Sequence, residues 1–382
     1  MKRSIIYFIL IFLAILSFQA WAQQQAQMPG RPQQPDYAKA KVLQVETFEY
    51  AEPEAEQRFE QSTQMVTLKI LSGKHKGETV SVNHMASGMM GTDMVLKKGD
   101  KVLVYVDEEP SEAESMAGET TFHIADYVRT VPMFWLTFLY CLLLVVIGGM
   151  KGLKSLISLI ITIAMLFFVM FPLVLMGYSP LFVSILIVGV VSFIVFRIIG
   201  GNTIKSKSAA IGTFVGVAIA GLLAMMVGKI VHLTGLSSQE AKILLYAMEM
   251  KLNFQGLLFG SILIGALGAI MDIGMSIASA VDEVKKHKKN ANFKDLFDAG
   301  MNVGRDVMGT MSNTLILAYT GSALPLLLLL IANHVPMSKI INLELIASEI
   351  VRALAGSTGL VLCIPITAAV AAYMYTKDQK AD

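Results

Sequence analysis

The sequence predicts a membrane protein: a seven-helix transmembrane bundle, preceded by a small extracytoplasmic β-barrel-like (OB-like) domain and a signal peptide. The first observation is composition. Of 382 residues, 54% are hydrophobic and only 16% are charged, whereas soluble domains carry roughly 25% charged residues. The second is a series of long apolar runs after Arg129, and the third is a stretch of short β-like runs before it. A net charge of +2 gives no electrostatic reason to expect nucleic acid as a partner.

Residues 1–22 have the three parts of a secretory signal peptide. Lys2 and Arg3 are a basic start, residues 5–16 are apolar, and Ala20-Trp21-Ala22 is a small-x-small cleavage pattern. An uncleaved anchor helix is the alternative. Residues 23–36 are rich in Gln and Pro, which predicts a flexible linker.

Residues 37–129 predict the β domain. Five runs rich in Val and Thr partly alternate between apolar and polar residues, and Gly-containing turns such as "SGKHKG" and "KKGD" separate them. Five short strands in so short a stretch favour a small barrel or sandwich. We expect no nucleic-acid role for this domain. A predicted signal peptide precedes it, and no predicted strand has a basic face that also carries aromatic residues.

One loop of this domain, "HMASGMMGTDM", raises a metal hypothesis. His84, Met85, Met89 and Met90 combine imidazole and thioether groups, which suit Cu(I). The alternative is a loop whose methionines cover the barrel or touch the membrane, because the spacing matches no defined ligand set. We expect no other cofactor.

Seven later segments are long and apolar enough to cross a membrane, which takes about 20 helical residues. They cover residues 130–150, 155–176, 180–199, 208–228, 255–281, 307–332 and 353–376. If the β domain is outside, most Lys and Arg residues between the helices fall on the inner side. The positive-inside rule thus agrees with the signal peptide and places the C-terminus in the cytoplasm. Two further segments, 237–252 and 342–354, have the spacing of amphipathic helices at the outer interface.

The fifth of these segments contains one acid, Asp272, well inside an apolar run. It lies about 13 Å from the inner end of the segment at 1.5 Å per residue. A charge there costs roughly 2.5–3.5 kcal/mol by insertion scales. Asp272 shares one helical stripe with Gly265, Gly268, Ser276 and Ser279. Two interpretations stay open: an acid that carries an ion or proton, and a structural acid hydrogen-bonded to a neighbouring helix, for which we expect the sixth.

The sixth and seventh segments supply further candidates. Pathway candidates are Asn313, Thr320 and Ser322, and structural or gating candidates are Arg305, Asp306, Pro325 and Arg352. Pro325 removes a backbone donor, so "YTGSALP" is expected to be kinked or unwound. For Arg305 and Asp306 the alternative to a site role is a salt bridge at the interface or a helix cap.

Common enzyme motifs are absent from the sequence. The chain has no phosphate loop "GxxxxGK[ST]", no "HExxH", no "GxSxG" and no paired "CxxC". We therefore expect that it is not an enzyme.

Three stretches carry a resemblance to the YibE/F-like family of bacterial membrane proteins. They are "GALGAIMDIGMSIASAVDEV", "AGMNVGRDVMGTMSNTLILAYTGSALPLLLL" and "EIVRALAGSTGLVLCIPITA". The preceding β domain also fits the layout of the family, whose members are described as permeases. The resemblance implies a multi-pass protein of the bacterial inner membrane, without naming a substrate.

Two functions are therefore compared. The first is a permease that moves an ion or small solute along a path lined by the fifth to seventh segments, with Asp272 as the carrier. The second is a membrane-anchored interaction or assembly protein that transports nothing, whose β domain binds an envelope protein. The lipid bilayer is the expected partner in both, and a second copy of the chain is a further one.

Overall fold

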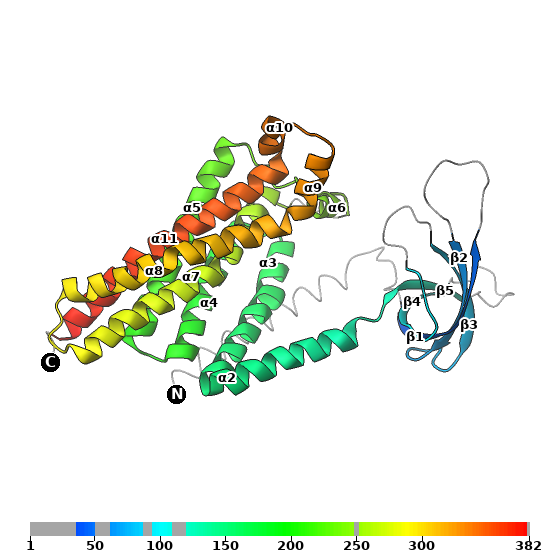
Figure 1. Cartoon of the computed structure of the whole chain (residues 1–382), viewed down its shortest axis with the longest axis horizontal. Helices are drawn as coiled ribbons and strands as arrows, with labels where there is room; N and C mark the ends of the chain where they lie inside the picture. The colour runs from blue at the N-terminus through cyan, green and yellow to red at the C-terminus, as the bar shows by residue number, and fades with distance from the viewer. Residues whose placement is uncertain (1–35, 50–61, 87–93, 109–119, 248–251, 380–382) are drawn as a thin grey trace. The chain divides into compact units, whose positions relative to one another are not determined.

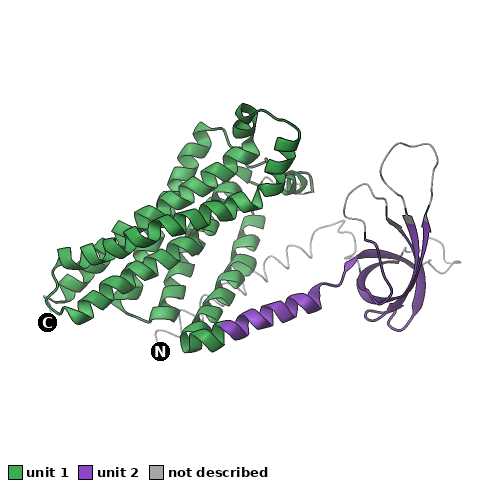
Figure 2. Ribbon diagram, in the orientation of Figure 1, with its two compact units in different colours: residues 1–26, 144–382 green, residues 27–143 purple. Residues whose placement is uncertain are grey.

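The computed structural model describes residues 36–49, 62–86, 94–108, 120–247 and 252–379 (Figure 1). The described residues form two compact units, one within residues 27–143 and the other within 144–382 (Figure 2). The expected signal peptide and all but the last residue of the expected linker lie outside the described residues. So do Met89 and Met90.

The first unit contains a five-stranded antiparallel half-barrel, which confirms a small barrel-like β domain. Its strands are β1 (Asp36–Glu49), β2 (Ser62–Ile70), β3 (Thr79–Ala86), β4 (Lys101–Glu108) and β5 (Thr120–Tyr127). The strand order is β3-β2-β1-β4-β5, with β1 in the centre. Register shifts at Val42/Gln44 in β1 and Leu103/Val104 in β4 bend the sheet in the way β-bulges do.

Buried and exposed residues alternate along the strands, so the sheet has one apolar face and one polar face. Ala38, Ala40 and Val42 of β1 are buried, whereas Lys39 and Lys41 between them are exposed. Side chains of a strand alternate between its two faces, so one face of each strand builds the core. The other face carries the polar and charged residues.

The helical region begins directly after the half-barrel. It contains α2 (Thr130–Met165), a π-helical turn η1 (Leu166–Met170), α3 (Phe171–Leu175), α4 (Pro180–Gly200), α5 (Ile204–Ile230), α6 (Gln239–Ala247), α7 (Phe254–His287), α8 (Phe293–Ser322), α9 (Leu324–Ala332), α10 (Met337–Asn342) and α11 (Glu344–Asp378).

Five helices of the described residues are long and apolar enough to cross a membrane, or six if the bent pair α8 and α9 is one span. These two helices meet at an angle of 57°, and Pro325 stands in the first turn of α9. The kink expected at "YTGSALP" is therefore confirmed. The two segments expected at 130–150 and 155–176 fall within one helical run, Thr130–Leu175. Its backbone departs from helical geometry at Gly149, where φ is 54° and ψ is −135°.

The prediction of a separate amphipathic helix at residues 342–354 was wrong. Residues from Glu344 onward are the first turns of α11, which continues without a break to Asp378. The sequence has no helix-breaking residue between them and the apolar segment, so the hydrogen-bonded ladder runs through both. Pro365 lies inside the same helix.

Glycines bring α5, α7 and α11 together at the centre of the helical unit. A Cβ atom at Gly212 would lie 1.8 Å from Thr367 Oγ1, and one at Gly359 would lie 2.6 Å from the carbonyl oxygen of Gly216. Small residues allow helix backbones to approach this closely in membranes. Thr213 Oγ1 of α5 reaches the carbonyl oxygen of Ile270 in α7, at 3.5 Å.

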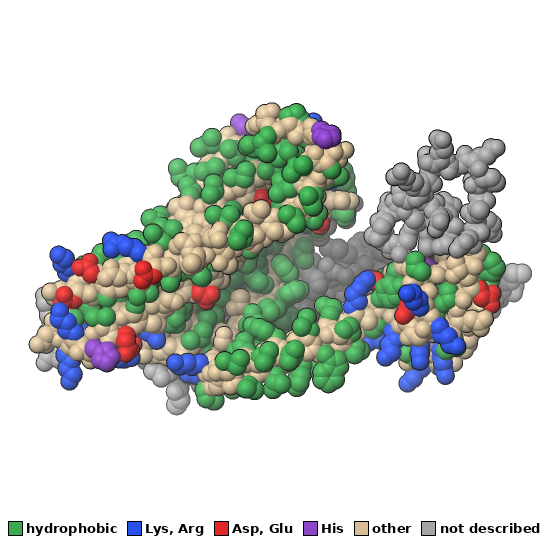
Figure 3. All heavy atoms as spheres, viewed as in Figure 1, with side chains coloured by type: hydrophobic (Ala, Val, Ile, Leu, Met, Phe, Trp, Pro, Cys, Tyr) green, Lys and Arg blue, Asp and Glu red, His purple; other side chains and the backbone are tan. Residues whose placement is uncertain are grey.

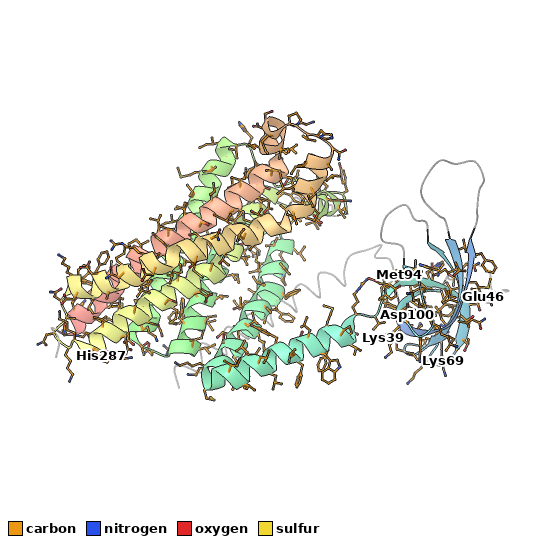
Figure 4. The ribbon with its side chains drawn as sticks, viewed as in Figure 1. Lys39, Glu46, Lys69, Met94, Asp100 and His287 are labelled. Atoms are coloured by element: carbon orange, nitrogen blue, oxygen red, sulfur yellow. The ribbon has the colours of Figure 1, made fainter. Side chains whose placement is uncertain are left out.

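The end of the bundle where α7 meets α8 is charged. Tyr375 Oη of α11 donates to Asp282 Oδ1 of α7 at 2.5 Å, and Lys286 Nζ lies 2.8 Å from Asp282 Oδ2. Lys288 pairs with Asp295 at the start of α8. Figure 3 shows charged side chains of both signs gathered at this end, where Figure 4 labels His287. These contacts fix the ends of three helices.

We predict that Gly359→Ala destabilises the helical unit. The added methyl would meet the backbone of α5, which cannot move away as a side-chain tip could, and overpacking of this kind costs about 1–3 kcal/mol. The measurement is the melting temperature of the purified protein in detergent, which should fall. Gly309→Ala is the matched control, because a Cβ at Gly309 meets nothing within 4 Å. Equal melting temperatures of the two variants would contradict the close contact.

Candidate functional site

Asp272 lies on the outward face of α7. Ile270, Ile273 and Ile277 point into the core, while Asp272 and Ser276 are exposed in the described residues. Gly265 and Gly268 lie on the same exposed face, as the spacing predicts. The close contacts with α5 and α11 hold the opposite face of α7, and this turns the polar stripe away from the core.

A cleft of about 370 Å³ lies beside this stripe. Its walls come from α2, η1, α4 and α7. Most lining residues are apolar, and the polar ones are Ser155, Ser158, Thr162 and Asp272. Asp272 is the one charged residue among the described residues that line the cleft. An acid within an apolar, membrane-spanning helix thus lines the same cleft as hydroxyl groups of a second helix.

Two of the three hydroxyl groups in the cleft leave their oxygen atoms available as acceptors. Ser158 Oγ donates to the carbonyl oxygen of Lys154 at 2.8 Å, and Thr162 Oγ1 donates to that of Ser158 at 2.9 Å. A hydroxyl has one proton to donate and two lone pairs. Because these protons are used within α2, the oxygens present lone pairs.

The Asp272 carboxylate has no hydrogen bond or ion pair within the described parts of the chain; the contact at this residue is Ser276 Oγ donating to its backbone oxygen at 2.8 Å. Carboxylate and hydroxyl oxygens together suit a proton or a hard cation. An anion would find no positive group among the described lining residues. Within the described ranges, no cluster of three or more His, Cys, Asp or Glu residues could hold a metal ion.

The sixth predicted segment does not contribute to this cleft. None of the described lining residues comes from α8, although Asn313 and Thr320 were expected near Asp272. Both are exposed along α8. Ser322 Oγ donates to Tyr319 O at 2.7 Å, and on α7 Ser279 Oγ donates to Met275 O at 2.7 Å. Sequence reasoning missed Ser155, Ser158 and Thr162, whose spacing of three and four residues in an apolar helix was the available signal.

Arg352 takes part in a second polar cluster. Arg352 Nη1 lies 2.9 Å from Glu349 Oε1, and the two side chains are only 23% and 21% exposed. Its guanidinium also lies over the ring of Tyr319, 5.8 Å from the centroid, and its Nη2 is 3.5 Å from Ser261 Oγ. Tyr319 Oη in turn packs over Gly265, where a Cβ would lie 2.5 Å away. This cluster ties α7, α8 and α11 together, so Arg352 and Gly265 hold helices in contact.

The remaining candidate residues make few polar contacts within the described residues. Arg305 and Asp306 are exposed, and neither forms an ion pair within the described residues; Arg305 Nη1 reaches Asn302 Oδ1 at 3.5 Å. His84 Nε2 lies 2.9 Å from the carbonyl oxygen of Met94, which occupies one ring nitrogen. Met85 adjoins it in β3.

Two family models match the chain. Residues 35–127 match the YibE/F family N-terminal domain, and residues 136–377 match the YibE/F-like protein model. The first match covers the half-barrel, and the second covers almost the whole helical region, including the cleft. No curated protein and no solved structure matches significantly. The chain therefore belongs to the YibE/F-like family and has both parts of its architecture.

Proposed function

We propose that this protein is a membrane permease that moves a proton or a small hard cation, with Asp272 as the carrier group. The observation that carries the proposal is the cleft beside α7. It combines one carboxylate without a protein partner among the described residues and three hydroxyl-bearing residues of α2. An ionisable residue inside a membrane-spanning helix is rare, and it most often belongs to an ion or proton path.

The competing structural interpretation of Asp272 needs a partner for the carboxylate. A buried acid that only holds helices together would accept hydrogen bonds from a neighbouring helix. The cluster of Arg352 and Glu349 illustrates that arrangement, since Arg352 Nη1 lies 2.9 Å from Glu349 Oε1. The carboxylate of Asp272 has no such contact within the described residues, which favours the carrier interpretation.

The proposed path differs from the one expected from the sequence. It runs between α2, α4 and α7, because the residues that line the cleft lie there. The bend of 57° between α8 and α9 resembles the interrupted helices of transporters. We propose that α8, α9 and α11 support α7 and adjust its position during transport.

We further propose that the chain crosses the membrane seven times. The run Thr130–Leu175 has 46 residues, which would extend about 69 Å as one helix, more than twice the hydrocarbon core of about 30 Å. The non-helical backbone at Gly149 divides it into two parts of adequate length. Lys151 and Lys154 follow the break, as basic residues do on the cytoplasmic side. The proposed location is the bacterial inner membrane, with the half-barrel outside and the C-terminus in the cytoplasm.

Replacing the carboxylate should abolish flux. The test uses proteoliposomes that contain an entrapped pH-sensitive or sodium-sensitive dye, driven by a proton or sodium gradient. Asp272→Asn keeps the side-chain size but removes the charge, so its flux should fall to that of protein-free vesicles. Asp298→Asn is the control, because Asp298 is exposed on α8 and is not among the residues lining the cleft. Gradient-driven flux that survives in Asp272→Asn would remove this residue from the mechanism.

A hydroxyl of α2 should contribute to cation affinity. Thr162→Val removes one acceptor oxygen worth about 0.5–1.5 kcal/mol, so half-saturation should require about 2–10 times more cation, with maximal flux retained. Thr358→Val is the matched control. Its hydroxyl makes the same bond to the carbonyl four residues back, at 2.8 Å, but it lies on α11 outside the cleft. An equal shift in both variants would show that the effect is structural.

The seven-span topology can be tested by thiol labelling from each side of the membrane. In a chain with Cys141 and Cys363 replaced by Ser, Lys154→Cys and Lys377→Cys should react with an impermeant maleimide from the cytoplasmic side. Tyr178→Cys, in the turn between α3 and α4, should react from the opposite side. Labelling of Lys154→Cys and Tyr178→Cys from the same side would contradict a division at Gly149.

A further inference from the structure

Three lysines stand side by side across the outer face of the half-barrel. In the sheet register Lys41 of β1 is directly paired with Lys69 of β2 on one side and with Lys101 of β4 on the other. Neighbouring strands lie about 4.8 Å apart, so the three side chains form a continuous row. All three are exposed, as is Lys39, two residues earlier on the same face of β1.

This arrangement is unfavourable for the isolated sheet. Like charges directly opposite each other on neighbouring strands repel and destabilise the pair. No ion pair within the described residues offsets this repulsion; the lysines concerned are Lys39, Lys41, Lys69, Lys97, Lys98 and Lys101. A row of unpaired cations that survives at a cost to the sheet indicates that an external anion compensates it.

The lysines of the domain are also segregated. Every lysine of residues 36–129 lies in the row, beside it, or in the adjoining turns: Lys39, Lys41, Lys69, Lys74, Lys76, Lys97, Lys98 and Lys101. Figure 3 shows Lys and Arg side chains gathered along one end of the half-barrel, and Figure 4 shows Lys39 and Lys69 toward that end, with Glu46 away from it. The positive charge therefore belongs to one end of the sheet.

This end is the one from which the chain enters α2. Val128 N donates to the carbonyl oxygen of Lys101 at 2.8 Å, so the chain leaves β5 beside the lysine row. Arg129 is engaged with Asp126 at 2.6 Å, and this hydrogen bond holds the pKa of Asp126 below its ordinary value. Thr130 already begins α2. Two connecting residues span at most about 7 Å, within a Debye length of about 10 Å at 0.1 M salt.

The first turns of α2 mark where the bilayer begins. Phe134, Trp135 and Phe138 form a cluster of rings with centroids 5.9–6.4 Å apart, and all three are exposed. Trp and other aromatic side chains gather at the membrane–water interface, at the level of the headgroups. The lysine row therefore stands next to a headgroup layer, whichever side of the membrane the half-barrel occupies.

We propose that the row of Lys41, Lys69 and Lys101, with Lys39, Lys97 and Lys98 beside it, binds the anionic lipid headgroups of the leaflet that α2 enters. Headgroup phosphates compensate the cross-strand repulsion and hold the half-barrel against the bilayer. The inference does not rest on the permease function, because it concerns only the half-barrel and the start of α2. A soluble polyanion, such as a nucleic acid or an acidic protein, is the competing occupant. The adjoining membrane-spanning helix favours lipid.

The test measures lysine acetylation of the full-length protein in nanodiscs by mass spectrometry. The discs contain phosphatidylcholine alone or phosphatidylcholine mixed with phosphatidylglycerol. Acetylation of Lys41, Lys69 and Lys101 should slow about threefold or more in the anionic discs, and the difference should vanish at about 1 M salt, where the Debye length falls to about 3 Å. Glu46→Lys supplies a control lysine farther along β1, whose acetylation should be the same in both lipids.

A triple variant separates headgroup binding from simple burial. Lys41→Gln, Lys69→Gln and Lys101→Gln together should remove the lipid dependence of acetylation at Lys97 and Lys98. In neutral discs the same variant should melt at a higher temperature than wild type, because the cross-strand repulsion is gone. Equal acetylation in both lipids would overturn the proposal. Protection by added heparin without protection by phosphatidylglycerol would do the same and would identify a soluble polyanion as the occupant.

Discussion

The close contact of α5, α7 and α11 is the constraint on which the rest of the helical unit depends. Gly212, Gly216 and Gly359 allow the backbones to meet where any larger residue would collide. Once α7 is held on this side, its remaining face is fixed by the helical period. The stripe that carries Asp272 then has to point outward, toward α2 and α4. A shift of α7 by one residue would rotate it by about 100° and would bury the acid among isoleucines.

The protein accommodates charge within its apolar helices in two different ways. Arg352 and Glu349 compensate each other at 2.9 Å and hold three helices through Tyr319 and Ser261. Asp272 instead lines a cleft with Ser158 and Thr162, whose hydroxyl protons are already donated to the backbone of α2. The first arrangement pairs opposite charges within the protein, and the second offers acceptors that a cation or proton would satisfy.

The half-barrel also carries charged groups without a partner among the described residues, and here the charges are positive. Its strands place a row of cations beside the residues that lead into α2. Each lysine alone would be an ordinary solvated side chain. The sheet register makes them a surface, because pairing brings together residues that are far apart along the chain.

Local sequence patterns are enough to predict which segments form strands and helices and where one helix bends. Period-two alternation predicted the β domain, long apolar runs predicted the helices, and Pro325 predicted the bend between α8 and α9. These signals are local, because strand faces, helix length and the missing proline donor act within a few residues. Local spacing also placed Gly265, Gly268, Asp272 and Ser276 on one face of α7.

Which elements come into contact depends on long-range packing. The sequence indicated the sixth segment as the neighbour of Asp272, but the cleft is built with α2 and α4. Single strands likewise contain no sign of the lysine row, because the row extends across β1, β2 and β4. Lys41, Lys69 and Lys101 belong to three strands, and their alignment depends on register, which long-range pairing sets. Helix partners likewise depend on which small residues find a matching surface, and a single helical pattern does not contain that information.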